Sequence, residues 1–221
     1  MKRSFHRFGL IFLTLLTFVL TGCFEYSQKI VLNSDGSGEL EIRYRVPVSR
    51  LLEVSDPKFP TQRYEIQHMI RKNYTSQGVR LNDLQIDKRS HSVRVYANFS
   101  FKHISILNTL PQFRNEEFGF SKDKNEIRFN QAIHLSEKDW LQSSTLFETG
   151  IKFAFKKDIT RKVKIRFEVQ TPYPIESTNA SYEIGDRRAV WHFRLSEILK
   201  NGTTQMEIVM KKKGKLRKTV K

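Results

Sequence analysis

Residues 92–101 alternate strictly between apolar and polar side chains, and this pattern constrains the fold more than any other feature of the chain. The apolar positions are Val93, Val95, Ala97, Phe99 and Phe101, and the positions between them are Arg94, Tyr96, Asn98 and Ser100. Because successive side chains of a strand point to opposite faces of a sheet, the pattern predicts a strand with one buried face.

The same alternation recurs along the chain and predicts about nine strands, mostly joined in hairpins. Residues 39–46 alternate, and Asp35-Gly36 provides the positive-φ turn of a hairpin with residues 29–32. The other predicted strands cover residues 79–86, 117–121, 126–135, 162–170, 180–184, 189–195 and 205–210. The expected class is α+β with a mostly antiparallel sheet. A chain of 221 residues that is 38% hydrophobic can bury one sizeable core.

One main helix is expected over residues 61–76. An apolar stripe repeats there near helical spacing: Tyr64, Ile66, Met69, Ile70 and Tyr74. Gly78 follows where a C-terminal cap is expected. Short helices are expected at residues 105–110 and after Ser136, and residues 151–155 form either a short strand or an exposed amphipathic loop.

The first 22 residues have the form of a cleaved export signal. Lys2, Arg3 and Arg7 give a positively charged start, and the apolar run 10–20 follows. A run of about 11 apolar residues is too short for a bilayer-spanning helix, which needs roughly 20.

The junction Leu20-Thr21-Gly22-Cys23 resembles the lipobox of bacterial lipoproteins, a Leu, two small residues and an obligatory Cys. The resemblance implies cleavage between Gly22 and Cys23, a diacylglycerol thioether on Cys23 and a usually acylated new N-terminus. Cys23 is the only cysteine, and a thiolate is the nucleophile that the thioether needs. The alternative is an uncleaved signal anchor with an incidental cysteine. The mature protein is then expected to be tethered to a membrane without spanning it.

No Gly/Ser-rich or Pro-rich linker divides the mature chain, so a single α+β domain is expected over residues 23–210, with 135–160 as the one plausible boundary. The formal net charge is +16, and seven basic residues lie in the last eleven: Lys211, Lys212, Lys213, Lys215, Arg217, Lys218 and Lys221. Residues 211–221 are therefore expected to form a flexible basic tail. Such a tail attracts anionic headgroups or envelope polymers, or is a solvated terminus that only raises solubility. Nucleic acid is not an expected partner, because the export signal conflicts with it and the tail lacks interleaved aromatic residues.

The sequence contains no recognisable catalytic or metal-binding motif. Five histidines lie in the mature chain: His68, His91, His103, His134 and His192. None is paired at i, i+2 or i, i+4 with another His or Cys, and the glycine patterns of nucleophile elbows, phosphate loops and dinucleotide folds are missing. We therefore expect no metal, no cofactor and no enzymatic activity. A hydrolase assembled from distant residues is the weakest alternative.

Three short segments resemble the LppM-type domain of bacterial lipoproteins. They are the hairpin Asp35-Gly36-Ser37-Gly38, the run from Thr171 to Ala180 and the strand Val190-Trp191-His192-Phe193. The resemblance implies an envelope lipoprotein with an α+β domain, linked in some members to binding of lipid or glycolipid. This chain has two prolines, Pro172 and Pro174, where one is usual, and no ligand residues are carried over. Trp191 is interpreted as a core residue and not as a ligand-stacking one.

Two functions are therefore expected, both for a non-enzymatic lipoprotein of the cell envelope. In the first, the protein binds a lipid, another amphipathic ligand or another envelope component in a cavity lined by the inward faces of residues 93–101 and 163–169. In the second, the core is filled and the basic tail contacts anionic membrane or polymer. Because Phe24 and not Asp follows Cys23, the outer membrane is favoured if the host has two membranes, and a cytoplasmic location is not expected.

Overall fold

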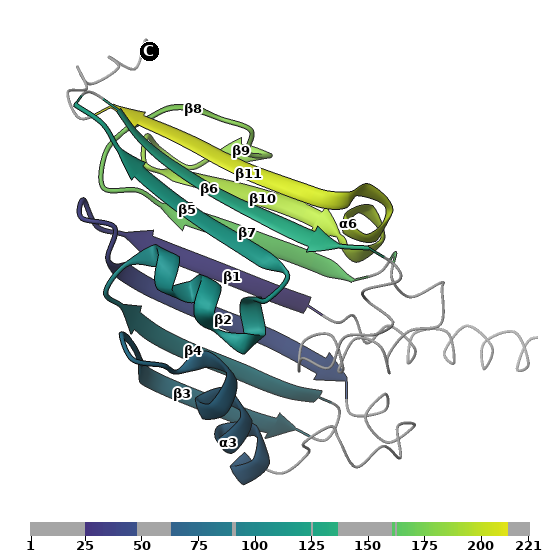
Figure 1. The fold of residues 1–221 in the computed structure, drawn as a ribbon. Coiled ribbons are helices and arrows are strands. Elements are labelled where there is room, and N and C mark those ends of the chain that lie inside the picture. Colours follow the sequence, from purple (N-terminus) through teal and green to yellow (C-terminus); the bar gives the residue numbers. More distant parts are fainter. Residues whose placement is uncertain are drawn as a thin grey trace, which may run out of the picture.

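The computed structural model describes residues 25–47, 63–89, 92–124, 126–136, 161 and 163–211. These residues form a seven-stranded mixed sheet and a four-stranded antiparallel sheet (Figure 1). In spatial order, the first contains β3 (Val79–Arg89), β4 (Ser92–Phe101), β2 (Gly38–Pro47), β1 (Glu25–Leu32), β7 (Lys164–Gln170), β10 (Arg188–Arg194) and β9 (Tyr182–Glu183). The second contains β5 (Glu116–Lys122), β6 (Glu126–Leu135), β11 (Gly202–Lys211) and β8 (Ile175–Thr178). The helices are α3 (Arg63–Tyr74), α6 (Leu195–Asn201) and the 3-10 helices η1 (Ile104–Thr109) and η2 (Pro111–Phe113).

Strands β2 and β4 confirm the predicted alternation. The inward side chains of β4 are 0–4% exposed, while Arg94 on the same strand is exposed. The β1–β2 turn is closed by a hydrogen bond from the Asn33 backbone N–H to the Ser37 carbonyl, 2.8 Å, with Gly36 at φ 85°. A hairpin at Asp35-Gly36 is therefore confirmed, and its positive φ explains why glycine stands there.

The seven-stranded sheet is mixed and not purely antiparallel, which corrects part of the expected class. Strand β1 pairs in parallel with β7, from Glu25 opposite Lys164 to Val31 opposite Gln170. A parallel pair cannot be closed by a tight turn, and here the connecting chain includes the hairpin β5–β6 of the other sheet. The pairing of strands so distant in sequence leaves no local pattern, so only hairpins were predicted.

The segment from Thr171 to Ala180 carries the chain from one sheet to the other. After β7, the run containing Pro172 and Pro174 leads into β8, which pairs with β11 of the four-stranded sheet. Asn179 then links the sheets through its side chain, because its Oδ1 accepts from Trp191 Nε1 at 3.0 Å and from the Glu207 backbone N–H at 2.9 Å. Trp191 is 2% exposed, so its interpretation as a core residue is confirmed.

The inner face of the seven-stranded sheet shares one apolar core with the four-stranded sheet and the helices. In Figure 1, α3, η1 and η2 lie over the β1–β4 part of the large sheet. Tyr74 of α3 stacks on Phe99 of β4, with ring centroids 5.3 Å apart and an interplanar angle of 16°. The predicted stripe of the main helix is only partly right, because Ile66, Ile70 and Tyr74 are buried whereas Tyr64 is 73% exposed. Tyr64 lies in the first turn of α3.

Several elements differ from the expected list. The structure has eleven strands in its described part, not about nine, and β8 and α6 were not predicted. The described part of the main helix is Arg63–Tyr74, close to the expected 61–76, and the turn expected at 105–110 is the 3-10 helix η1. Residues 137–160, with their predicted short helix and short strand, lie outside the described residues, as does the proposed domain boundary there.

Candidate functional site

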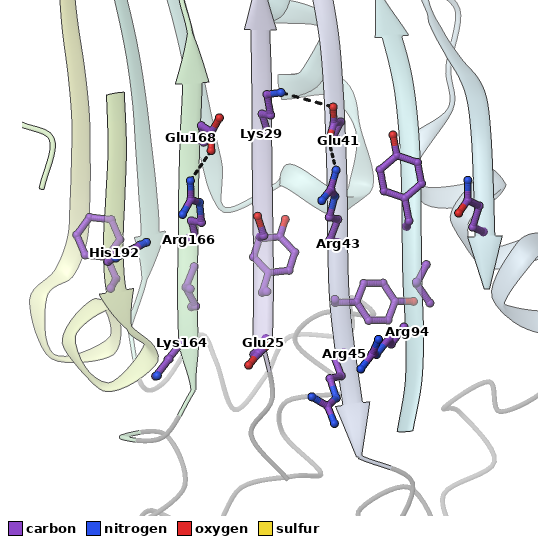
Figure 2. Close-up of a pocket in the computed structure, with 18 of the residues that line it drawn as sticks. Glu25, Lys29, Glu41, Arg43, Arg45, Arg94, Lys164, Arg166, Glu168 and His192 are labelled. Atoms are coloured by element: carbon purple, nitrogen blue, oxygen red, sulfur yellow. Dashed lines mark hydrogen bonds and ion pairs between the residues drawn. The ribbon is translucent and has the colours of Figure 1, made fainter. Parts of the chain in front are cut away.

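The outer face of the seven-stranded sheet, opposite the core, carries a hollow of about 1470 Å³. Its walls are the outward side chains of β1, β2, β3, β4, β7 and β10, together with Glu197 of α6 (Figure 2). Most of these side chains are charged or aromatic, in contrast to the apolar inner face. The hollow is therefore suited to a polar or charged ligand.

The register of the strands aligns these outward side chains in rows across the sheet. We call one of them the middle row: Gln85, Tyr96, Arg43, Ser27, Arg166 and His192. Each neighbouring pair in the row is a direct cross-strand pair, so the side chains stand about 5 Å apart along the row. Residues from six strands and from both halves of the chain thus meet on one surface.

Two carboxylates hold the cations of this face in place. Glu41 lies 2.9 Å from Arg43 and 3.8 Å from Lys29, and Glu168 lies 2.6 Å from Arg166 and 3.6 Å from Arg188. Figure 2 shows three of these pairs as dashed lines. Each carboxylate is shared by two cations, and a guanidinium has five N–H donors. Arg43 and Arg166 are therefore oriented by their carboxylate and keep donors for an added anion.

Aromatic rings flank both arginines. The guanidinium carbon of Arg43 lies 5.1 Å from the ring centroid of Tyr96, in a cation–π contact. Burial, followed by the charge of Glu41, raises the pKa of Tyr96, so this ring stays neutral. On the other side, Arg166 Nη1 donates to the Tyr182 hydroxyl at 3.3 Å, and the Tyr182 ring meets the His192 ring edge-on at 5.4 Å.

The pKa of His192 responds to the positive charge of this face. Its pKa is lowered first by burial, then by the charges of Arg166 and Lys164. A neutral imidazole at one end of the middle row can donate or accept a hydrogen bond. A bound anion would oppose the two cations and raise the pKa of His192.

A second row lies where β1 and β7 begin, and we call it the end row. Its members are Asp87, Arg94, Arg45, Glu25, Lys164 and Arg194. In this row Arg45 and Arg94 are direct cross-strand partners, and Arg94, Lys164 and Arg194 are exposed. Four cations thus stand against two acids, and Asp87 is already in an ion pair with Arg89 at 2.8 Å.

The observed hollow and the cavity expected from the sequence lie on opposite sides of the sheet. The inward side chains of residues 93–101 and 163–169 are packed in the apolar core. The hollow is lined instead by outward side chains of the same strands, including Arg94, Tyr96, Lys164 and Arg166. Their alternation with apolar residues was read only as the solvated side of a strand, and the cross-strand register that gathers them is not visible in the sequence.

The other predicted site residues fall outside the described part of the chain. Gly22 and Cys23 precede Glu25, and residues 212–221 of the basic tail follow Lys211. Lys211 itself forms an ion pair with Glu176. Among the described residues, no three His, Cys, Asp or Glu side chains gather as metal ligands would, and no helix is long and apolar enough to cross a membrane.

The sequence profile of the LIC11874-like family matches residues 18–211. The chain belongs to this family. The matched stretch contains Cys23 and every described element of both sheets, so the charged face belongs to the part of the chain that defines family membership. No curated protein matches the chain.

Among solved structures, the folded domain of LppM from Mycobacterium tuberculosis, determined by NMR, is similar with a TM-score of 0.43 and 13% sequence identity. The similarity covers 85% of this chain and 89% of that chain. The LppM resemblance expected from the sequence is thus found as a weak structural likeness, and at this score no property of LppM is transferred to the LIC11874-like chain.

Proposed function

We propose that this chain is a non-enzymatic lipoprotein of a bacterial cell envelope, tethered by a lipid on Cys23, which binds an anionic or amphipathic envelope molecule on its charged face. The observation that carries the binding proposal is the position of Arg43 and Arg166 in one hollow, each oriented by its own carboxylate. Preoriented guanidinium groups bind phosphate or carboxylate groups with paired hydrogen bonds.

The tether is supported by the position of the only cysteine. Cys23 ends the sequence Leu20-Thr21-Gly22-Cys23 and stands two residues before β1. All the described elements follow this residue in the sequence, so a lipid there would hold them by the N-terminal end of the mature chain. With Phe24 after the cysteine, the outer membrane is the proposed location in a host with two membranes.

The chemistry of the hollow defines the ligand class. Arg43 and Arg166 supply charge, while Tyr96 offers an aromatic face and His192 a neutral polar group. An anionic headgroup fits these features better than a purely apolar molecule.

The tether is tested by metabolic labelling with radioactive palmitate. The natural chain is expected to take up label and to fractionate with membranes, whereas a Cys23→Ser chain should take up none. Equal label in both chains would exclude lipidation at Cys23. Release of the Cys23→Ser chain into the soluble fraction would add that the lipid is the anchor.

The ligand site is tested with soluble short-chain phospholipids. Dihexanoyl phosphatidylglycerol is expected to bind the natural chain more tightly than dihexanoyl phosphatidylcholine, and to bind an Arg43→Gln/Arg166→Gln variant about tenfold more weakly or worse, because a charged hydrogen bond contributes about 1.5–3 kcal/mol. The control is Arg80→Gln/Arg128→Gln, which removes the same charge from positions outside the hollow. Equal affinity of both double variants would exclude the hollow as the site.

A second candidate is that the basic tail contacts an anionic polymer. The Lys211 backbone N–H bonds the Pro174 carbonyl, beyond the end of β7, so the tail begins at the end of the large sheet opposite Glu25. This position favours a partner distant from the tethering membrane. Deleting residues 212–221 should then weaken binding to soluble polyphosphate with a steep salt dependence. Equal binding of truncated and full-length chains at low salt would exclude this role.

A further inference from the structure

The two ends of the seven-stranded sheet differ in charge. We call the end where β1 and β7 begin the Glu25 end, and the end where they finish the Gly38 end. The charged residues of the strand termini and turns at the Glu25 end are Arg45, Lys88, Arg89, Arg94, Arg161, Lys164 and Arg194 against Glu25, Asp87 and Glu197. Those at the Gly38 end are Arg80, Lys102, Arg187 and Arg188 against Asp35, Glu39, Glu183 and Asp186. Among the residues that the structure describes, seven cations face three acids at one end, and four face four at the other.

The cations of the Glu25 end are weakly neutralised by the fold. Arg45 and Arg94 are direct cross-strand partners, an arrangement that costs stability unless an anion lies between them. Arg45 Nε is buried and has no hydrogen-bond partner in the described part of the protein. Lys164 and Arg194, which pair in register, add two exposed cations to the same row. This end therefore has unused capacity to bind anions.

The chain geometry places the proposed anchor at this same end. Cys23 precedes Glu25 by two residues, and two residues span about 7 Å at most. An acyl chain on Cys23 would thus enter the bilayer beside the end row. In Figure 2 the labelled members Arg94, Arg45, Glu25 and Lys164 lie together near one end of their strands.

From the charge asymmetry and this geometry we infer that the Glu25 end docks on anionic lipid headgroups of the membrane that holds the anchor, through Arg45, Arg94, Lys164 and Arg194. This inference rests on the proposed lipid tether. Each cation near an anionic surface strengthens the contact, and the tether holds them there. The docked sheet stands with its strands rising from the bilayer, so the hollow opens beside the headgroups and the neutral Gly38 end points away.

The test uses the chain in the form that the host produces after any signal cleavage and lipidation. It measures which lysines a bilayer shields from acetylation. The protein is reconstituted in nanodiscs of phosphatidylcholine alone, or with about one-third phosphatidylglycerol to make the surface anionic. Lysines are acetylated with a succinimidyl ester and quantified by mass spectrometry. Phosphatidylglycerol should slow labelling of Lys164 and Lys88 at least threefold, leave Lys102 unchanged, and lose its effect in about 0.5 M salt.

A matched pair of variants separates docking from general charge effects. Arg94→Gln/Lys164→Gln should abolish the protection of Lys88, whereas Lys102→Gln/Arg187→Gln, which removes the same charge from the Gly38 end, should keep it. If each of Lys88, Lys164 and Lys102 were labelled at the same rate in both kinds of nanodisc, the inference would be overturned. So would protection of Lys164 by soluble polyphosphate in neutral discs to the level reached with phosphatidylglycerol, because the row would then bind polyanions and not the bilayer.

Failure of the tether is distinguished by the mass of the N-terminal peptide, which is measured first. If Cys23 carries no lipid, the labelling is repeated with protein mixed with vesicles of the same two compositions. Protection of Lys164 by the anionic vesicles would retain docking without the anchor, and no protection would exclude docking as well.

Discussion

Arg45 on β2 and Arg94 on β4 lie directly opposite each other in an antiparallel pair. Like charges at such positions destabilise a sheet. The fold nevertheless contains this pair at the end of the sheet with the largest excess of cations. The arrangement is consistent with a surface that is completed by an anion from outside the chain.

Replacing one of these two arginines should stabilise the isolated protein. We expect Arg94→Gln to raise the free energy of unfolding by about 0.2–1 kcal/mol at low salt, because it removes the repulsion from Arg45. The gain should shrink in high salt, where exposed charges are screened. Urea unfolding at two salt concentrations measures it, with Arg80→Gln on β3 as the control. A loss of stability in Arg94→Gln that does not depend on salt would contradict this account.

Two tyrosines on α3 should differ sharply in their contribution to stability. Tyr74 is 2% exposed and stacks on Phe99, so Tyr74→Ala should lower the free energy of unfolding by about 3 kcal/mol. Tyr64 on the same helix is 73% exposed, and Tyr64→Ala should change it by less than about 0.5 kcal/mol. Chemical denaturation of both variants tests the placement of α3 on the sheet. Similar losses for the two would show that α3 is packed in a different orientation.

Two glycines should respond differently to an added methyl group. At Gly38 a Cβ would lie 2.0 Å from the Val31 carbonyl oxygen, a backbone atom that cannot move without disturbing the β1–β2 pair. Gly38→Ala should therefore destabilise the protein by about 1–3 kcal/mol. Gly185 has φ 66° with nothing within 4 Å of the added carbon, so Gly185→Ala should cost only about 1 kcal/mol of backbone strain. Thermal unfolding compares them, and a larger loss at Gly185 would contradict the predicted order.

The protonation of His192 should make stability depend on pH in a defined direction. Its pKa in the folded protein lies below the ordinary value of 6.5, so below that pH the unfolded chain binds a proton that the folded chain does not. Stability should therefore fall as pH drops through 6.5 toward the lowered pKa, and His192 should contribute no pH dependence well above 6.5, where it is neutral in both states. His192→Gln should show a flatter pH profile of unfolding.

Nuclear magnetic resonance titration of His192 checks the cause of that shift. Lys164→Gln should raise the pKa of His192, because the Lys164 charge is one of the groups that lower it. An added anionic ligand in the hollow should raise it as well. A pKa that is the same in the natural chain and in Lys164→Gln would show that the charge of Lys164 does not lower it.

The strand positions were largely predictable because they depend on local alternation. Residues 92–101 and 126–135 were predicted with the bounds that β4 and β6 have, since each strand carries its buried face in its own sequence. The same local information placed Trp191 in the core. Helix α6 was missed because its seven residues follow β10 without a break and its first residue, Leu195, continues the alternation of that strand.

The charged face could not be predicted, because it depends on which strands become neighbours. Arg43 and Arg166 are 123 positions apart, and they share a row only because β1 pairs with β2 on one side and, in parallel, with β7 on the other. Local alternation determines which side chains leave the core, since that choice follows from the two-residue period of each strand. Register and strand order are selected by the burial of the whole core, and they alone decide which outward side chains meet in the hollow and in the end row.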